Sequence, residues 1–197
     1  REPFNLDGWR VDVANMSGRQ GDLDVTHQVA KMTRAAMEEE GDDKLLIAEH
    51  FHDAGPDLDG DGWHGAMNYS AFMKPVWSWL VAESFDRDWL GMPTKVPSTT
   101  GRQMVASIQS FAARMPWRSY NYSWSLLDSH DTARIRSVAG GQGRQHVAAT
   151  LLMTLPGTPM IFAGDEIGAE GLWGEDSRTT FPWDDTCTWR SSLVARV

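Results

Sequence analysis

The chain has 197 residues, of which 27 are acidic and 18 basic, so its net charge is −9. This acidic balance disfavours a nucleic-acid-binding surface, because phosphate neutralisation needs Lys and Arg. No apolar run is long enough to span a membrane, and the single cysteine, Cys187, excludes an internal disulfide. We therefore expect a globular chain with neither a nucleic acid nor a membrane as its partner.

The first predicted strand covers residues 8–14, GWRVDVA, in which apolar residues are nearly continuous. Such a run is typical of a strand buried on both faces of a parallel sheet. Arg10 and Asp12 lie two residues apart within it, so their side chains point to the same side. Burying this pair is costly unless the two groups are bonded to each other or serve a function. For an isolated pair a structural ion pair is the simpler interpretation; the acids that follow favour a function.

A helix and a second strand follow the first. Apolar residues recur at helical spacing over residues 25–37, with Asp24 as the candidate N-cap. The apolar run LLIA at 45–48 then leads directly into Glu49 and His50. A strand, a helix and a strand in this order predict a parallel strand pair with a right-handed crossover.

The loop after the second strand contains DLDGDG at residues 57–62, which matches the start of an EF-hand calcium loop. The twelfth position of that motif should hold a bidentate Glu, and here it is Asn68. We therefore favour an Asp- and Gly-rich turn, and expect neither a required cofactor nor a metal site. Weak calcium binding by Asp57, Asp59 and Asp61 is the alternative.

The remaining chain alternates predicted strands and helices. Strands are expected at 66–69, 123–127 and 159–163, and helices at 71–81, 144–155, 188–197 and from Gly101 to just before Pro116. A linker-like loop is expected at 93–100. Polar and acidic residues follow the strands, as in DSHD at 128–131 and GDE at 164–166.

This pattern predicts an α/β fold that forms the C-terminal part of a (β/α)8 TIM barrel. In such barrels the chemistry lies at the carboxyl ends of the strands, and a complete barrel needs eight units and about 250 residues. The predicted strands and helices of this chain amount to about four to five of the eight βα units. We expect residues 1–197 to be a partial catalytic domain that lacks the first strands, ends within the last helix and is inactive alone.

Asp12, Glu49 and Asp131 close three different predicted strands, so barrel geometry would bring them to one mouth. Glycoside hydrolysis needs a carboxylate nucleophile and a carboxylic acid, about 5–5.5 Å apart in retaining enzymes. The ten Trp residues fit this chemistry, because Trp stacks on sugar rings as well as filling cores. A divalent-metal site made from the same acids is the rival interpretation. Arg10 argues against it at Asp12, since a cation already neutralises that group.

Four stretches, in order along the chain, resemble the motifs of the α-amylase family of glycoside hydrolases. They are DGWRVDVAN at 7–15, IAE at 47–49, LDSHD at 127–131 and the segment 157–166. The resemblance implies that Asp12 is the nucleophile, Glu49 the general acid/base and Asp131 the residue that supports the transition state. It also implies that Arg10 and His130 bind substrate at the cleavage site. The family's first motif is absent and would lie before Arg1.

Within the family, VAN at 13–15 is most similar to the maltodextrin-degrading members, namely cyclomaltodextrinases, neopullulanases and maltogenic amylases, although Met16 stands where a Glu is common. Ser177 and Arg178, with FPW at 181–183, are similar to α-glucosidase members. The resemblance implies a retaining hydrolase of α-glucosidic bonds in maltooligosaccharides or related α-glucans, acting through a covalent glycosyl-enzyme intermediate.

Two alternatives to this hydrolase stay open. One is an α-glucosyl transferase or isomerase of the same family, and the other is a non-catalytic carbohydrate-binding homologue. The resemblance favours a cytoplasmic location and is compatible with a homodimeric parent enzyme. The chain opens on Arg1 rather than Met, so the sequence itself does not test for a signal peptide.

Overall fold

The computed structural model describes residues 4–41, 43–89 and 92–183, and the chain divides into two compact units. The first unit contains the chain up to residue 71 together with 108–125 and 156–158. The second contains 72–107, 126–155 and the chain from residue 159. Cys187 and the helix predicted at 188–197 lie outside the described residues.

The first unit is built on a parallel sheet in the order β1-β4-β5, with β1 at Gly8–Val11, β4 at Leu45–Ala48 and β5 at Gly65–Ala66. Trp9 lies opposite Leu46 and Val11 opposite Ala48, so the two strands end together. A parallel bridge from Met67 to Trp124 extends the ladder. The parallel pair predicted from the strand–helix–strand pattern is therefore confirmed.

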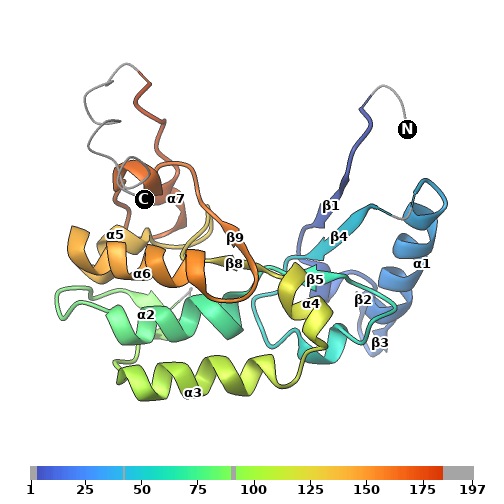
Figure 1. The fold of residues 1–197 in the computed structure, drawn as a ribbon, viewed down its shortest axis with the longest axis horizontal. Coiled ribbons are helices and arrows are strands. Elements are labelled where there is room, and N and C mark those ends of the chain that lie inside the picture. Colours follow the sequence, from blue (N-terminus) through green and yellow to red (C-terminus); the bar gives the residue numbers. More distant parts are fainter. Residues whose placement is uncertain (1–3, 42, 90–91, 184–197) are drawn as a thin grey trace. The chain divides into compact units, whose positions relative to one another are not determined.

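The connection from β1 to β4 contains more structure than the polar loop and helix expected from the sequence. It comprises a 3-10 turn at Ala14–Met16, an antiparallel hairpin of β2 (Arg19–Gln20) and β3 (Leu23–Asp24), and helix α1 (Thr26–Glu38). Asp24 belongs to β3, and its Oδ1 accepts a hydrogen bond of 3.1 Å from the amide of Thr26, the first residue of α1. Figure 1 shows α1 beside β1 and β4.

Helix α1 buries a different face from the one its largest apolar residues predict. Thr26 and Ala30 are buried, whereas Met32 is 73% exposed. Ala30 lies so close to Gly62 that a Cβ on that glycine would be 3.1 Å from the alanine methyl. At this point the helix packs through small residues, which allow a close approach, while Met37 further along the helix is partly buried against the same core.

Strand β1 ends three residues earlier than predicted and is not buried on both faces. Val13 has a φ of 43°, in the left-handed region that β-branched residues avoid, and this turns the chain out of the strand. Trp9 is 56% exposed. Among the described residues β1 pairs only with β4, so its other edge is uncovered by a strand there.

The rest of the first unit covers β5. After β4 a short 3-10 turn at Gly55–Asp57 leads into the loop before β5, and α4 (Trp117–Tyr122) packs on that strand. Gly65 in β5 lies so close to the end of α4 that a Cβ there would be 2.7 Å from the Ser123 amide nitrogen. Only glycine fits this approach.

The second unit is mainly helical. Its elements are α2 (Lys74–Leu80), the hairpin β6 (Asp88–Trp89) and β7 (Met92–Lys95), α5 (Ile135–Ala139), α6 (Gln142–Thr154), the 3-10 turn Asp165–Ile167 and α7 (Gly174–Ser177). A π-helical turn, Tyr69–Met73, runs directly into α2. The Trp77 Nε1 of α2 donates a 2.6 Å hydrogen bond to the Leu127 carbonyl, which fixes α2 to the segment that carries the DSHD motif.

Besides the π-helical turn, which crosses the boundary between residues 71 and 72, the described elements divided between the units are helix α3 (Gly101–Ala112) and the paired strands β8 (Trp124–Leu126) and β9 (Thr158–Met160). The expectation of a buried last strand at 159–163 is wrong for the described chain. Strand β9 is largely exposed, and Ile161 after it is 45% exposed. Strand β9 pairs with β8 alone among the described strands, and a single neighbour leaves much of a strand uncovered. None of the described helices is long and apolar enough to cross a membrane.

Candidate active site

Arg10, Asp12 and Glu49 come together at the carboxyl ends of β1 and β4. Because Val11 and Ala48 are opposite each other, the residues that follow them emerge side by side. Arg10 Nη1 lies 2.5 Å from Asp12 Oδ1, and Arg10 Nη2 lies 3.0 Å from Glu49 Oε1. One guanidinium thus bridges both carboxylates, an arrangement that its fork of donors suits.

The two carboxylates differ sharply in their surroundings. The Glu49 side chain is 4% exposed, and its Oε2 accepts a 2.6 Å hydrogen bond from the Val13 amide. The Glu49 backbone is also paired, since its amide donates to the Val11 carbonyl at 2.9 Å and its carbonyl accepts from the Ala14 amide at 3.1 Å. The Asp12 side chain, by contrast, is 75% exposed. One acid is therefore held in a fixed position, while the other is open to a ligand.

The unusual backbone of Val13 serves this arrangement. Its left-handed conformation directs the amide to Glu49, and the next residue, Ala14, is fully buried. Backbone strain of this kind persists only where the surroundings stabilise it, and it is common at functional sites. Arg10 is held as well, because its Nε lies 3.4 Å from the Met67 sulfur at the end of β5.

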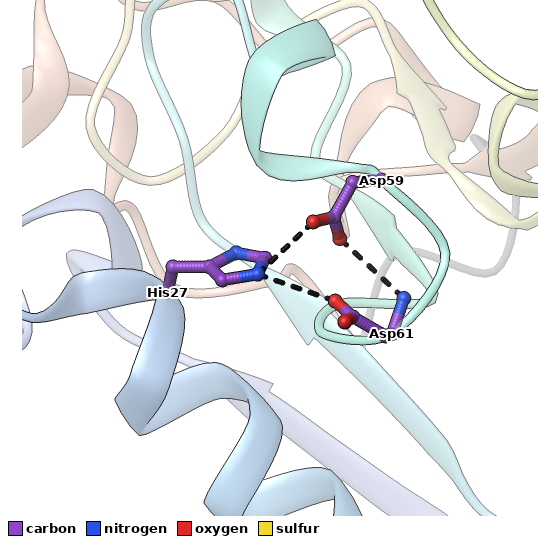
Figure 2. A group of neighbouring side chains, drawn as sticks. All are labelled: His27, Asp59 and Asp61. Atoms are coloured by element: carbon purple, nitrogen blue, oxygen red, sulfur yellow. Dashed lines mark hydrogen bonds and ion pairs between the residues drawn. The ribbon is translucent and has the colours of Figure 1, made fainter.

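The three Asp residues of the 57–62 loop do not act as one group. Asp57 Oδ2 lies 2.9 Å from the Nε2 of the buried His50, and this hydrogen bond lowers the pKa of Asp57. Asp59 and Asp61 turn the other way, toward His27 on α1 (Figure 2). The predicted EF-hand-like series is therefore divided between two histidines.

Figure 2 shows the second of these groups. His27 Nε2 lies 3.0 Å from Asp59 Oδ2 and 3.3 Å from Asp61 Oδ1, and Lys31 also pairs with Asp61. The hydrogen bond from Lys31 lowers the pKa of Asp61. No sequence motif links His27 to these aspartates, because it lies about thirty positions before them on another element. The Lys31 ammonium group already pairs with Asp61, and that disfavours a metal ion there.

His130 and Asp131 lie in the second unit, so the predicted site residues form two groups, one in each unit. His130 Nε2 is 3.2 Å from Asp131 Oδ2. Arg178, which the sequence analysis left without a role, contacts the same pair: its Nη2 lies 3.1 Å from Asp131 Oδ1, and its Nε donates to the His130 carbonyl at 2.8 Å. A small cavity of about 60 Å³ lies beside Asp131 and is lined by Asp88 and Trp173 among others.

A buried acidic pair supports this second group. Asp128 is 1% exposed, and its Oδ2 accepts a 2.6 Å hydrogen bond from the Ile135 amide. Burial and the neighbouring Asp165 raise the pKa of Asp128 well above its usual value. Burial also raises the pKa of Asp165, against the effect of Arg134, whose Nη1 lies 3.0 Å from Asp165 Oδ1. The sequence showed both acids as motif residues but gave no sign that they pair.

Comparison with known proteins decides the family. Residues 2–192 match the family model described as Alpha amylase, catalytic domain. The chain belongs to the α-amylase family. It is 31% identical to a cyclomaltodextrinase from a Bacillus species over 92% of the chain, and 32% identical to neopullulanase 2 from Thermoactinomyces vulgaris over 91%. These alignments cover 28% and 27% of the two relatives, so the chain spans about a quarter of their length.

The fold of this α-amylase-family chain agrees with solved structures. The native debranching enzyme from Nostoc punctiforme superposes with a TM-score of 0.77 and 27% identity, covering 96% of this chain and 39% of that enzyme. The predicted α/β class and the predicted family are therefore confirmed, and the chain is part of a (β/α)8 barrel.

Proposed function

We propose that the protein containing this chain is a retaining glycoside hydrolase of α-glucosidic bonds in maltooligosaccharides or related α-glucans. The observation that carries the proposal is the Arg10 bridge between Asp12 and Glu49 at the carboxyl ends of adjacent parallel strands. Retaining glycosidases need two neighbouring carboxyl groups in different environments. The names of the relatives, cyclomaltodextrinase and neopullulanase 2, agree with an α-glucan substrate.

In the proposed mechanism Asp12 is the nucleophile. Its exposed carboxylate attacks the anomeric carbon, the glycosidic bond breaks, and a glucosyl ester forms on an Asp12 oxygen. The Arg10 guanidinium, 2.5 Å from Asp12 Oδ1, pairs with this carboxylate and holds it beside Glu49. Water then cleaves the ester and regenerates the carboxylate.

Glu49 is the proposed general acid and base. It gives a proton to the leaving oxygen in the first step and takes one from water in the second. Its Oε2 accepts from the Val13 amide and its Oε1 lies 3.0 Å from Arg10 Nη2, so both oxygens of the carboxyl group are held in place. Asp131, with His130 beside it, is proposed to bind sugar hydroxyls and to stabilise the positive charge that develops in the transition state.

The alternative of a non-catalytic homologue is disfavoured because all three acids are present. A transferase would share the covalent intermediate and differ only in whether water or a sugar intercepts it. We expect no cofactor to be required.

The direct test is to follow the anomer released from a maltooligosaccharide by NMR, using the full-length enzyme. Retention predicts that the α-anomer appears first and mutarotates afterwards. Initial release of the β-anomer would refute the retaining mechanism, and absence of any cleavage would refute the assignment as a hydrolase.

A further inference from the structure

Arg178 lies just after α7 and engages both residues of the His130–Asp131 pair. Its Nε donates to the His130 carbonyl at 2.8 Å, and its Nη2 lies 3.1 Å from Asp131 Oδ1. The remaining nitrogen, Nη1, lies 3.4 Å from Glu175 Oε1 in α7. Each of the three guanidinium nitrogens of Arg178 thus has a partner. One of these partners is the carboxylate of Asp131, which is proposed to act on the sugar.

The backbone from which Arg178 extends is fixed. Ser177, the preceding residue, is fully buried, and its Oγ donates to the Thr132 carbonyl at 2.8 Å. The Ser177 carbonyl accepts two hydrogen bonds, of 3.2 and 2.9 Å, from the buried guanidinium of Arg134. Because α7 is anchored to the segment just after Asp131, the position of Arg178 relative to that residue is set by short-range contacts.

The turn that carries Asp131 has a fixed backbone, but the hydrogen bonds of the turn do not involve the Asp131 carboxylate. The Ser129 amide donates to Thr132 Oγ1 at 2.9 Å, and the Thr132 amide donates back to the Ser129 carbonyl at 3.1 Å. The carboxylate of Asp131 is oriented separately, with Oδ2 beside His130 and Oδ1 beside Arg178. Without Arg178 only one of these two restraints would remain.

We infer that Arg178 is a positioning residue that orients the Asp131 carboxylate for the transition state, an inference that rests on the proposed function. Arg178 and Asp131 are both partly exposed, at 44% and 31% of their side chains, so their pairing contributes little to folding. The pairing instead fixes the position of the Asp131 carboxylate. This matters for catalysis, because displacing a catalytic group by about 1 Å can lower the reaction rate about 100-fold.

The test compares Arg178→Ala and Arg178→Lys with Arg102→Ala, a control at an exposed arginine near the start of α3. We expect Arg178→Ala to lower kcat about 100-fold on maltooligosaccharides with little change in KM, because the interaction is used mainly in the transition state. Arg178→Lys keeps the positive charge, but its single ammonium group cannot contact both His130 and Asp131. Its kcat should therefore lie between that of Arg178→Ala and that of the Arg102→Ala control. Added guanidinium ion should restore part of the activity of Arg178→Ala.

The outcomes separate this inference from the proposed function. Activity of both Arg178 variants equal to that of Arg102→Ala, or a loss confined to KM, would overturn the positioning role while the hydrolase assignment stands. A wild-type enzyme that does not cleave maltooligosaccharides would refute the proposed function itself. If Arg178→Ala melts at a lower temperature than wild type, the kcat of Arg178→Lys is the measurement to use. A kcat of Arg178→Lys equal to that of Arg102→Ala refutes the positioning role, and a kcat between those of Arg178→Ala and Arg102→Ala supports it.

Discussion

At the scale of single residues, Arg10 organises the first group of the candidate site. It pairs with an exposed carboxylate on its own strand and with a buried one on the neighbouring strand. The sequence predicted the first contact, because the two residues are two positions apart. It could not predict that Glu49 would also accept a hydrogen bond from the Val13 amide, since that depends on a left-handed backbone at a valine.

Asp12→Asn should abolish turnover without affecting the fold. The amide is a poor nucleophile, so we expect kcat to fall by about 10⁴-fold or more. The Asp12 side chain is 75% exposed, so the loss of its ion pair should change the free energy of unfolding by no more than about 1 kcal/mol. Kinetics and urea unfolding, with exposed Asp22→Asn as the control, check both statements. Substantial activity in Asp12→Asn would exclude it as the nucleophile.

Glu49→Gln should impair the enzyme in a way that depends on the leaving group. Glutamine cannot donate a proton as an acid, so cleavage of maltooligosaccharides should fall by about 10²–10⁴-fold. An aryl α-glucoside with a good leaving group needs less protonation and should lose far less in the first step. Comparing kcat/KM for the two substrates is the measurement. Equal, small losses on both would show that Glu49 is not the acid.

Among the helices and strands, the elements that could not be predicted from the sequence are short or packed through small residues. The hairpin β2–β3 has only two residues in each strand, too few for an alternating pattern to be recognised. The close contact between Ala30 of α1 and Gly62 could not be predicted, because both residues are small and neither stands out in an apolar pattern. Strand β4, whose apolar run is uninterrupted, was predicted with its observed bounds.

The buried pair of Asp128 and Asp165 should make stability depend on pH. The pKa of Asp128 is raised in the folded state, so the folded protein binds more protons than the unfolded chain above about pH 4. Its free energy of unfolding should therefore fall as the pH rises from about 4 through the folded-state pKa, by up to about 1.4 kcal/mol for each pH unit.

Asp128→Asn should weaken this dependence, because an amide can accept from the Ile135 amide and donate to Asp165 without titrating, which leaves Asp165 as the titrating member of the pair. Urea unfolding between pH 4 and 8 checks it, with the exposed Glu170→Gln as the control. The variant should gain stability relative to wild type as the pH rises. Parallel pH profiles for Asp128→Asn and wild type would show that Asp128 does not carry a raised pKa.

The loop at 57–62 should not form a tight calcium site. Asp57 is paired with His50, and the Glu expected at the twelfth position is replaced by Asn68. Lys31 and His27 compete for the two remaining aspartates. Calorimetric titration with calcium should therefore show no sub-micromolar binding. Binding of that strength that disappears in Asp59→Ala would prove this prediction wrong.

Taken over the whole chain, the predicted site residues fall into two groups, one within each unit. The first provides Arg10, Asp12 and Glu49, and the second provides His130 and Asp131. The family and the α/β class could be predicted because four motifs follow strands in a fixed order. Arg178 could not be assigned a role, since nothing in a sequence shows that a residue after α7 reaches back almost fifty positions to Asp131.

If Asp12 is the nucleophile, it forms a covalent bond to the sugar during each turnover. A fluorinated α-glucosyl fluoride that forms the glycosyl-enzyme quickly and hydrolyses slowly would trap that intermediate, and peptide mapping by mass spectrometry would locate it. The account predicts one added sugar on the peptide that contains Asp12, and none in Asp12→Asn. A sugar attached to Glu49 or to any other residue, or a competent enzyme that forms no adduct, would contradict it.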